Sequence, residues 1–169
     1  MIYDATIIGG GPSGSTAAEA LAKRGFRVAL IDRAGRIKPC GGAVPPRLIK
    51  DFDIPESQIV AKITTARMIS PTARKVDIPI ENGYVGMVDR ENFDEFLRTR
   101  AKTAGAHRFT GTFLRVLRNS EENSVAVVFK EKNSLKEITL KTKLIIGADG
   151  ARSNVARAEV PGGKTIPYV

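Results

Sequence analysis

A run of glycines near the N-terminus is the strongest candidate for chemistry in this sequence. Gly9, Gly11 and Gly14 match the spacing G-x-G-x-x-G, and an acid, Asp32, follows about 20 residues further on. Glycines at these positions allow a tight turn, close approach of backbone to a pyrophosphate, and packing of a helix on a strand. The acid can accept hydrogen bonds from ribose hydroxyls, and its charge repels a 2′-phosphate. The pattern predicts a site for FAD or NAD, and it argues against NADP in this pocket.

The elements around the glycines have the order that such a site requires. The apolar run 3–8 predicts a buried strand, residues 15–24 a helix that ends at Gly25, and residues 27–32 a second buried strand. This β-α-β unit directs free N–H groups and the positive end of the helix dipole toward the phosphates. The alternative is a glycine-rich turn beside a surface aspartate, which would not explain why all these features coincide. The predicted cofactor site also includes the neighbouring Pro12, Ser13 and Arg33.

The rest of the chain alternates between strand-like and helical patterns. Residues 33–46 are rich in glycine and proline and predict a long loop. Asp89 is a candidate N-cap for a helix over 90–104. Strands are expected at 62–70, 74–80 and 84–88, then at 108–118, 124–131 and 135–141 as an antiparallel meander, and finally at 144–147 as a short buried strand.

Composition narrows the class of protein. Hydrophobic residues make up 42% of the 169 and charged residues 27%, an ordinary globular balance without an apolar run long enough to span a membrane. The net charge of +9 suits a solvated basic surface, an anionic membrane surface or a phosphorylated ligand; no basic run with interleaved aromatics indicates nucleic acid. One cysteine and no signal sequence fit the cytoplasm, with peripheral binding to a membrane left open. One histidine, His107, beside one cysteine argues against a zinc site and against a catalytic triad.

Two further segments resemble flavoproteins. Residues 144–157 (LIIGADGARSNVAR) resemble the Asp-Gly segment of the flavoprotein hydroxylases and their relatives, with Asp149, Gly150 and Ser153 at matching positions. The arginine lies one place later than in hydroxylases, at Arg157, a spacing that resembles the reductase branch. Residues 90–97 (RENFDEFL) resemble the start of a helix beside the flavin, and this resemblance implies that Arg90 contacts the FAD ribityl chain or phosphate.

The loop and the strands after it resemble one family in particular. The runs 37–46 (IKPCGGAVPP), 66–71 (ARMISP) and 83–90 (GYVGMVDR) are similar to the geranylgeranyl reductases of chlorophyll and bacteriochlorophyll synthesis. The resemblance covers essentially the whole chain. It implies an α/β fold with a Rossmann-like FAD-binding domain of the flavoprotein-hydroxylase-like superfamily. This domain begins with a β-α-β unit and contains a three-stranded antiparallel meander as an insertion.

The resemblance also implies a reaction. Reduced FAD, supplied with electrons by NADPH or reduced ferredoxin, saturates three isolated double bonds of a geranylgeranyl chain to give a phytyl chain. The isoprenoid substrate is either the free diphosphate or geranylgeranylated bacteriochlorophyll, and the photosynthetic membrane is a place of peripheral association. Cys40, Gly41 and Gly42 are expected near the flavin, with Cys40 as a candidate proton donor, a packing group or a buried small hydrophobe.

Two other functions stay open at this point. An FAD-dependent aromatic hydroxylase has the same fold, and a truncated FAD-binding module would have no activity. Residues 1–169 are expected to be the N-terminal part of a discontinuous FAD-binding domain that is incomplete at its C-terminus. The substrate domain and the closing FAD segment would then lie beyond Val169.

Overall fold

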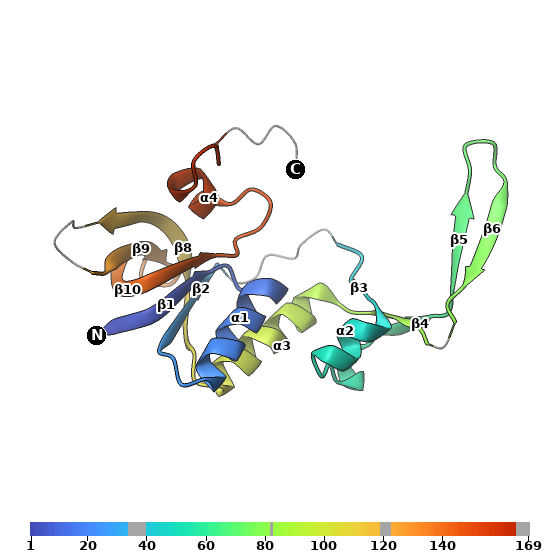
Figure 1. Ribbon diagram of the computed structural model, residues 1–169, viewed down its shortest axis with the longest axis horizontal. Helices are drawn as coiled ribbons and strands as arrows, with labels where there is room; N and C mark the ends of the chain where they lie inside the picture. The colour runs from blue at the N-terminus through green and yellow to red at the C-terminus, as the bar shows by residue number, and fades with distance from the viewer. Residues whose placement is uncertain (34–39, 82, 119–122, 165–169) are drawn as a thin grey trace. The chain divides into compact units, whose positions relative to one another are not determined.

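The computed structural model describes residues 1–33, 40–81, 83–118 and 123–164 (Figure 1). The chain divides into two compact units, one of residues 1–36 with 94–169 and one of residues 37–93. The boundary falls within helix α3 (Arg90–Thr103), so the beginning of this helix belongs to one unit and the remainder to the other.

The first unit begins with the predicted β-α-β arrangement. Strand β1 (Ile2–Ile8) is followed by helix α1 (Pro12–Lys23) and strand β2 (Val28–Asp32), and the two strands pair in parallel. The helix starts three residues earlier than the sequence pattern indicated. Pro12 explains this, because its fixed φ and missing N–H suit the first position of a helix.

Five strands of this unit form a closed sheet in the order β1-β10-β9-β8-β2. Strand β8 (His107–Arg118) lies parallel to β2 at its beginning and then pairs antiparallel with β9 (Val125–Glu131). Strand β10 (Glu137–Gly147) pairs antiparallel with β9 and then runs parallel to β1. The antiparallel meander is therefore continuous with the parallel sheet through two long strands.

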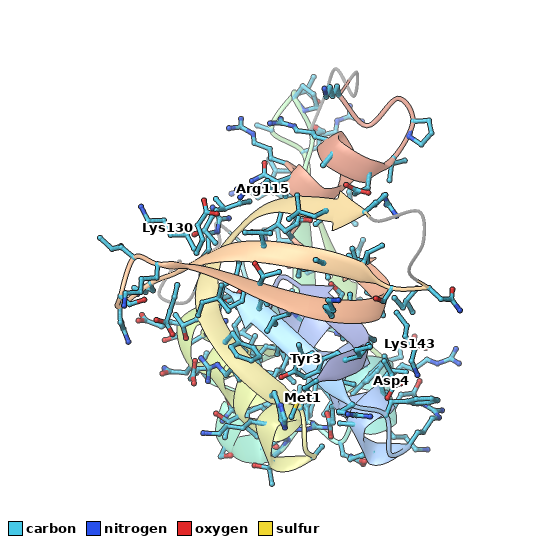
Figure 2. The ribbon with its side chains drawn as sticks, turned by 90° about the vertical axis from the view of Figure 1, so that its left-hand side faces the viewer. Met1, Tyr3, Asp4, Arg115, Lys130 and Lys143 are labelled. Carbon is cyan, nitrogen blue, oxygen red and sulfur yellow. The ribbon has the colours of Figure 1, made fainter. Side chains whose placement is uncertain are left out.

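The prediction of two separate strands at 135–141 and 144–147 is wrong, because β10 is a single strand. The sequence Lys141-Thr142-Lys143 looked like an interruption of the apolar pattern. In the structure the Thr142 hydroxyl donates to the Leu144 carbonyl at 3.0 Å, and Lys143 Nζ lies 2.7 Å from the Asp4 carboxylate across the sheet (Figure 2). The expected burial of this last segment is also wrong at Leu144, which is 54% exposed.

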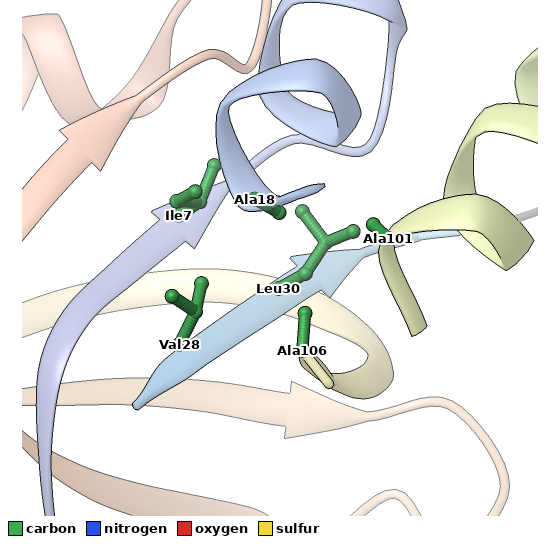
Figure 3. Packing of buried hydrophobic residues seen from close by; sticks show 6 residues of the cluster. All are labelled: Ile7, Ala18, Val28, Leu30, Ala101 and Ala106. Atoms are coloured by element: carbon green, nitrogen blue, oxygen red, sulfur yellow. The ribbon is translucent and has the colours of Figure 1, made fainter. Parts of the chain in front are cut away.

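Adjacent residues of β1 and β2 point into two different cores. Ile7 and Leu30 pack with Ala18 of α1 and Ala101 of α3 on one face of the sheet (Figure 3). Ile8 and its neighbours on the other face join a second cluster. Because successive strand residues face opposite sides, the continuous apolar runs of β1 and β2 are what a sheet buried on both faces requires. The second cluster consists of Ile8, Ile31, Phe113, Val127, Phe129 and Val155.

The second unit contains two small sheets. Strands β3 (Ala43–Val44), β7 (Val85–Met87) and β4 (Ala61–Ile63) form one sheet, and β5 (Thr65–Ile69) and β6 (Lys75–Pro79) form a hairpin. The expected strand 62–70 is thus two strands with different partners. Helix α2 (Pro46–Asp51) and a short 3₁₀ turn (Glu56–Gln58) precede β4. Of the predicted loop 33–46, residues 34–39 lie outside the described residues, and the remainder includes β3 and the first residue of α2.

Hydropathy and length give one further result. No helix in the described part of the chain is both long and apolar enough to cross a membrane.

We expect Thr6→Val to stabilise the protein. The Thr6 side chain is fully buried in β1, and its hydroxyl has no hydrogen-bond partner among the described residues. Replacing it with an apolar group of the same shape removes an unsatisfied polar atom, so the free energy of unfolding should rise by about 1 kcal/mol. Thermal unfolding should show an increase in Tm of about 2–4 °C.

Thr142→Val is the matched control for this substitution. Thr142 is equally buried, but its hydroxyl donates to the Leu144 carbonyl. This variant should lose stability or remain unchanged. Equal stabilisation by both substitutions would contradict the assignment of Thr6 as an unsatisfied group.

Candidate dinucleotide site

The glycine turn after β1 is packed too tightly for side chains. Gly9 has φ +105°, and a Cβ added there would lie 2.3 Å from the carbonyl oxygen of Ala148. A Cβ at Gly14 would lie 1.9 Å from the carbonyl oxygen of Gly9. Ala148, just after β10, also donates its N–H to the Ile8 carbonyl at 2.7 Å. The structure therefore brings the glycine fingerprint and the Ala148-Asp149-Gly150 segment into direct contact.

Helix α1 begins without a capping side chain. Its N-cap is Gly11, no side-chain hydrogen bond caps it, and the first turn contains no acid. The amides of Ser13 and Gly14, at the start of the helix, have no earlier carbonyl of the helix to donate to. Together with the positive end of the helix dipole, they suit an anion such as a pyrophosphate.

Helix α4 (Asn154–Glu159), which was not predicted, begins with side-chain caps, unlike α1. Both oxygens of the Asp149 carboxylate accept hydrogen bonds, one from the Ser153 hydroxyl and the other from the amides of Asn154 (2.6 Å) and Val155 (3.3 Å). Ser153 in turn accepts from the Ala156 amide at 2.8 Å. The side chains of Asp149 and Ser153 thus cap the start of α4. Of the two helices that begin in the described part of this unit, α1 is the one without a side-chain cap.

Asp32 lies at the end of β2 and holds the middle of the glycine turn. Its Oδ2 accepts from the Gly10 amide at 2.7 Å. The Gly10 carbonyl accepts from the Ser15 hydroxyl at 3.0 Å and from Arg98 Nη1 at 3.1 Å. A Cβ at Gly10 would lie 2.8 Å from Asp32 Cβ and 2.9 Å from Arg98 Cδ. Gly10, a variable position of the fingerprint, therefore needs to be glycine because two side chains pack on it.

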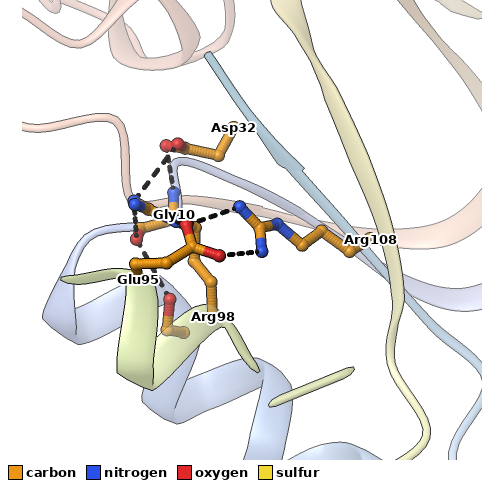
Figure 4. A network of polar contacts seen from close by, with 6 residues as sticks. Gly10, Asp32, Glu95, Arg98 and Arg108 are labelled. Carbon is orange, nitrogen blue, oxygen red and sulfur yellow. Dashed lines mark hydrogen bonds and ion pairs between the residues drawn. The ribbon is translucent and has the colours of Figure 1, made fainter. Parts of the chain in front are cut away.

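An arginine–carboxylate network extends from Asp32 to β8 (Figure 4). Arg98 Nη1 lies 3.4 Å from Asp32 Oδ1, and Arg98 Nε donates to Glu95 at 3.0 Å. Arg108 binds both oxygens of Glu95, at 2.6 and 2.8 Å. The hydrogen bonds from Arg108, and then those from Arg98, lower the pKa of Glu95 to about 2. Glu95 is thus charged at neutral pH and links the two guanidinium groups.

The remaining predicted site residues belong to the other unit or to the surface. Cys40 and Gly41 are exposed, and Arg90 is partly buried at the start of α3; all three belong to the second unit. Gly42 has φ +71°, and a Cβ there would lie 2.1 Å from the Val88 carbonyl oxygen. The packing of β3 against the end of β7 therefore already accounts for glycine at this position, and cofactor contact by these residues stays a prediction.

The other predicted residues near the glycine turn lie at or close to the surface. Pro12 is partly buried and Ser13 exposed in the first turn of α1, and Arg33 is exposed directly after β2. His107 is exposed at the start of β8, and its Nδ1 lies 2.9 Å from the Tyr3 hydroxyl.

Sequence analysis missed Arg98, although a signal was present. Asp94, Arg98 and Ala101 follow one another at the spacing of one helix face, and all three are buried. Charged residues are seldom fully buried without a partner. An acid and an arginine at helical spacing with an apolar residue of α3 could therefore have indicated a polar network.

Comparison with known proteins supports this geometry. Residues 54–163 match the model of a family described as an FAD binding domain, and residues 7–52 match an NAD(P)-binding Rossmann-like domain. The chain belongs to the FAD-binding domain family. Its glycine turn at the start of α1 and its parallel strands β1 and β2 have the arrangement of a dinucleotide-binding βαβ unit.

Three proteins to which the chain is similar are described as reductases or reductase-like. It is 63% identical, over its full length, to geranylgeranyl diphosphate reductase of Rhodobacter capsulatus, and covers 42% of that protein. It is 34% identical to digeranylgeranylglycerophospholipid reductase of Methanocaldococcus jannaschii, over 92% of this chain and 40% of that protein. A geranylgeranyl bacteriochlorophyll reductase-like structure from Thermoplasma acidophilum matches 88% of this chain and 39% of that chain, with TM-score 0.76 and 29% identity. The chain therefore spans about two fifths of the length of these proteins.

We expect the stabilising effect of Glu95 to disappear at acid pH. Its pKa in the folded protein, about 2, is below the ordinary value of 4.5, so folding favours the charged form. The contribution is complete above about pH 5 and is lost as the pH falls toward 2. The difference in unfolding free energy between wild type and Glu95→Gln, measured by urea unfolding, should shrink over this range.

Arg108 provides the control for that titration. In an Arg108→Met background the main partner of Glu95 is absent, so the pH dependence of the Glu95→Gln difference should become smaller. A difference that stays constant from pH 6 to 2.5 in the wild-type background would contradict the role of the network.

Proposed function

We propose that the protein containing this chain is an FAD-dependent reductase that saturates double bonds of a geranylgeranyl chain. The observation that carries the proposal is the 63% identity, across all 169 residues, to a geranylgeranyl diphosphate reductase. The dinucleotide geometry supports the cofactor part of the proposal independently. The similarity to a reductase of a geranylgeranylated lipid supports the isoprenoid chain as the shared feature of the substrates.

The residues of the first unit fit FAD. The uncapped start of α1 suits the diphosphate, and Asp32 at the end of β2 suits the adenosine ribose. The glycine turn has no room for side chains, because a Cβ at Gly9 or Gly14 would collide with backbone atoms. Its backbone can therefore come close to a ligand. We propose that Arg90, Cys40 and its following glycines contact the flavin half. When bound, FAD supplies hydride transfer, the chemistry that an unactivated double bond requires.

We further propose NADPH or reduced ferredoxin as the electron source and either geranylgeranyl diphosphate or geranylgeranylated bacteriochlorophyll as the substrate. Asp32 disfavours NADPH in the fingerprint pocket itself, since its carboxylate would repel a 2′-phosphate. The dry groove that holds an isoprenoid chain would be formed by the remainder of the protein, with residues 1–169 as the N-terminal part of a discontinuous FAD-binding domain. The net charge of +9 supports peripheral binding to an anionic membrane.

The direct test is reduction of the isoprenoid by the full-length protein. Purified protein should be yellow and should release FAD on denaturation. With dithionite or NADPH as reductant, geranylgeranyl diphosphate or the pigment ester should gain two hydrogens per reduced bond, up to three bonds, by mass spectrometry. A colourless protein would contradict the cofactor, and oxygen-dependent hydroxylation of an aromatic compound without any isoprenoid reduction would contradict the reaction.

Cys40→Ala tests whether this thiol donates a proton. We expect the variant to retain FAD and much of the turnover, because the Cys40 side chain is exposed and water can take the place of its thiol. Flavin reduction and reoxidation by substrate should be measured separately by stopped-flow absorbance. A decrease of more than about 10²-fold in the reoxidation step alone, with flavin reduction intact, would instead identify Cys40 as the proton donor.

A further inference from the structure

Arg98 is a nearly buried cation on α3 that contacts the glycine turn after β1, although the two are far apart in the sequence. Its side chain is 10% exposed. Its guanidinium donates to the Gly10 carbonyl at 3.1 Å, lies 3.4 Å from Asp32 Oδ1, and binds Glu95 at 3.0 Å (Figure 4). The planar fork of an arginine can make these contacts at the same time, which a lysine ammonium cannot do in the same geometry.

Stability alone is a weak reason for an arginine at this position. Removing a charge from water costs several kcal/mol, and well-packed apolar residues often replace a buried ion pair without loss. Ala101, one turn further along the same face of α3, is an example of an apolar residue that is fully buried there. A better explanation for the buried arginine is that it fixes the geometry of the groups that it contacts.

The group whose geometry depends on Arg98 is the Asp32 carboxylate. Oδ2 is held by the Gly10 amide at 2.7 Å, and Oδ1 is next to Arg98 Nη1. A carboxylate oxygen has about two acceptor positions, so one oxygen can accept more than one hydrogen bond. A carboxylate fixed at both oxygens can accept from two adjacent ribose hydroxyls without first losing rotamer freedom.

We propose that Arg98 is a positioning residue that gives the site its preference for a ribose with both hydroxyls. It acts through Asp32 and through the Gly10 peptide, and Glu95 and Arg108 hold its guanidinium in place. The inference rests on the proposed binding of FAD by this turn, but it concerns selectivity and not affinity alone. The quantity that tests it is the ratio of the dissociation constants for two ligands, one with both ribose hydroxyls and one that lacks the 2′-hydroxyl.

The experiment compares FAD with an FAD analogue that carries 2′-deoxyadenosine. Dissociation constants for both are measured by flavin fluorescence with the full-length protein. Wild type should prefer FAD by about tenfold or more, the effect expected from one hydrogen bond to a charged group. Asp32→Ala should abolish this preference. Arg98→Met should reduce the ratio toward one, and Arg98→Lys, which keeps the charge but not the fork, should give an intermediate ratio.

A purely structural role predicts a different result. General loosening of the site would weaken both ligands equally and leave their ratio at the wild-type value, and that result would overturn the inference. Arg115→Met is the matched control, because it removes an arginine from an exposed ion pair with Glu137 and should leave the ratio unchanged. If Arg98→Met does not fold, Arg98→Lys decides the question, since a wild-type ratio in that variant also overturns the inference.

The outcomes separate this inference from the function on which it rests. A wild-type protein that does not bind FAD contradicts the proposed cofactor. A wild type that binds both ligands equally contradicts the assignment of Asp32 to the ribose. A clear wild-type preference that persists in both Arg98 variants contradicts only the positioning role of Arg98.

Discussion

The first unit depends on a close backbone contact between the glycine turn and the end of β10. A Cβ at Gly9 would lie only 2.3 Å from the Ala148 carbonyl oxygen, and a Cβ at Gly14 only 1.9 Å from the Gly9 carbonyl oxygen. Glycine at both positions allows α1 to start directly after β1, close to the sheet. The same contact places Ala148, which follows β10 near the other end of the chain, beside the fingerprint.

A polar network extends from this contact to Asp32 at the end of β2. The Gly10 peptide is held at its N–H by Asp32 and at its carbonyl by Ser15 and Arg98. The network continues through Glu95, which the two arginines keep charged. In contrast, Asp149 accepts hydrogen bonds from the first amides of α4, whereas no side chain caps the start of α1.

The sequence predicted those parts of the fold whose causes are local. The β-α-β unit follows from apolar runs and glycines within about 30 residues, and the structure confirms it. The length of β10 could not be predicted in this way, because Lys143 is explained by Asp4 at the other end of the chain. The same is true of Arg98, whose contacts with Asp32 and Gly10 span 66 and 88 residues. Gly42 was expected to make room for a cofactor, but contact with Val88 is sufficient to explain it.

The central claim is that the α1 start and Asp32 together bind the adenosine diphosphate half of FAD. A crystal structure of the full-length protein with FAD tests it most directly. We expect diphosphate oxygens within hydrogen-bond distance of the Ser13 and Gly14 amides and ribose hydroxyls on the Asp32 carboxylate. FAD bound elsewhere, with both of these groups left in contact with solvent, would contradict it.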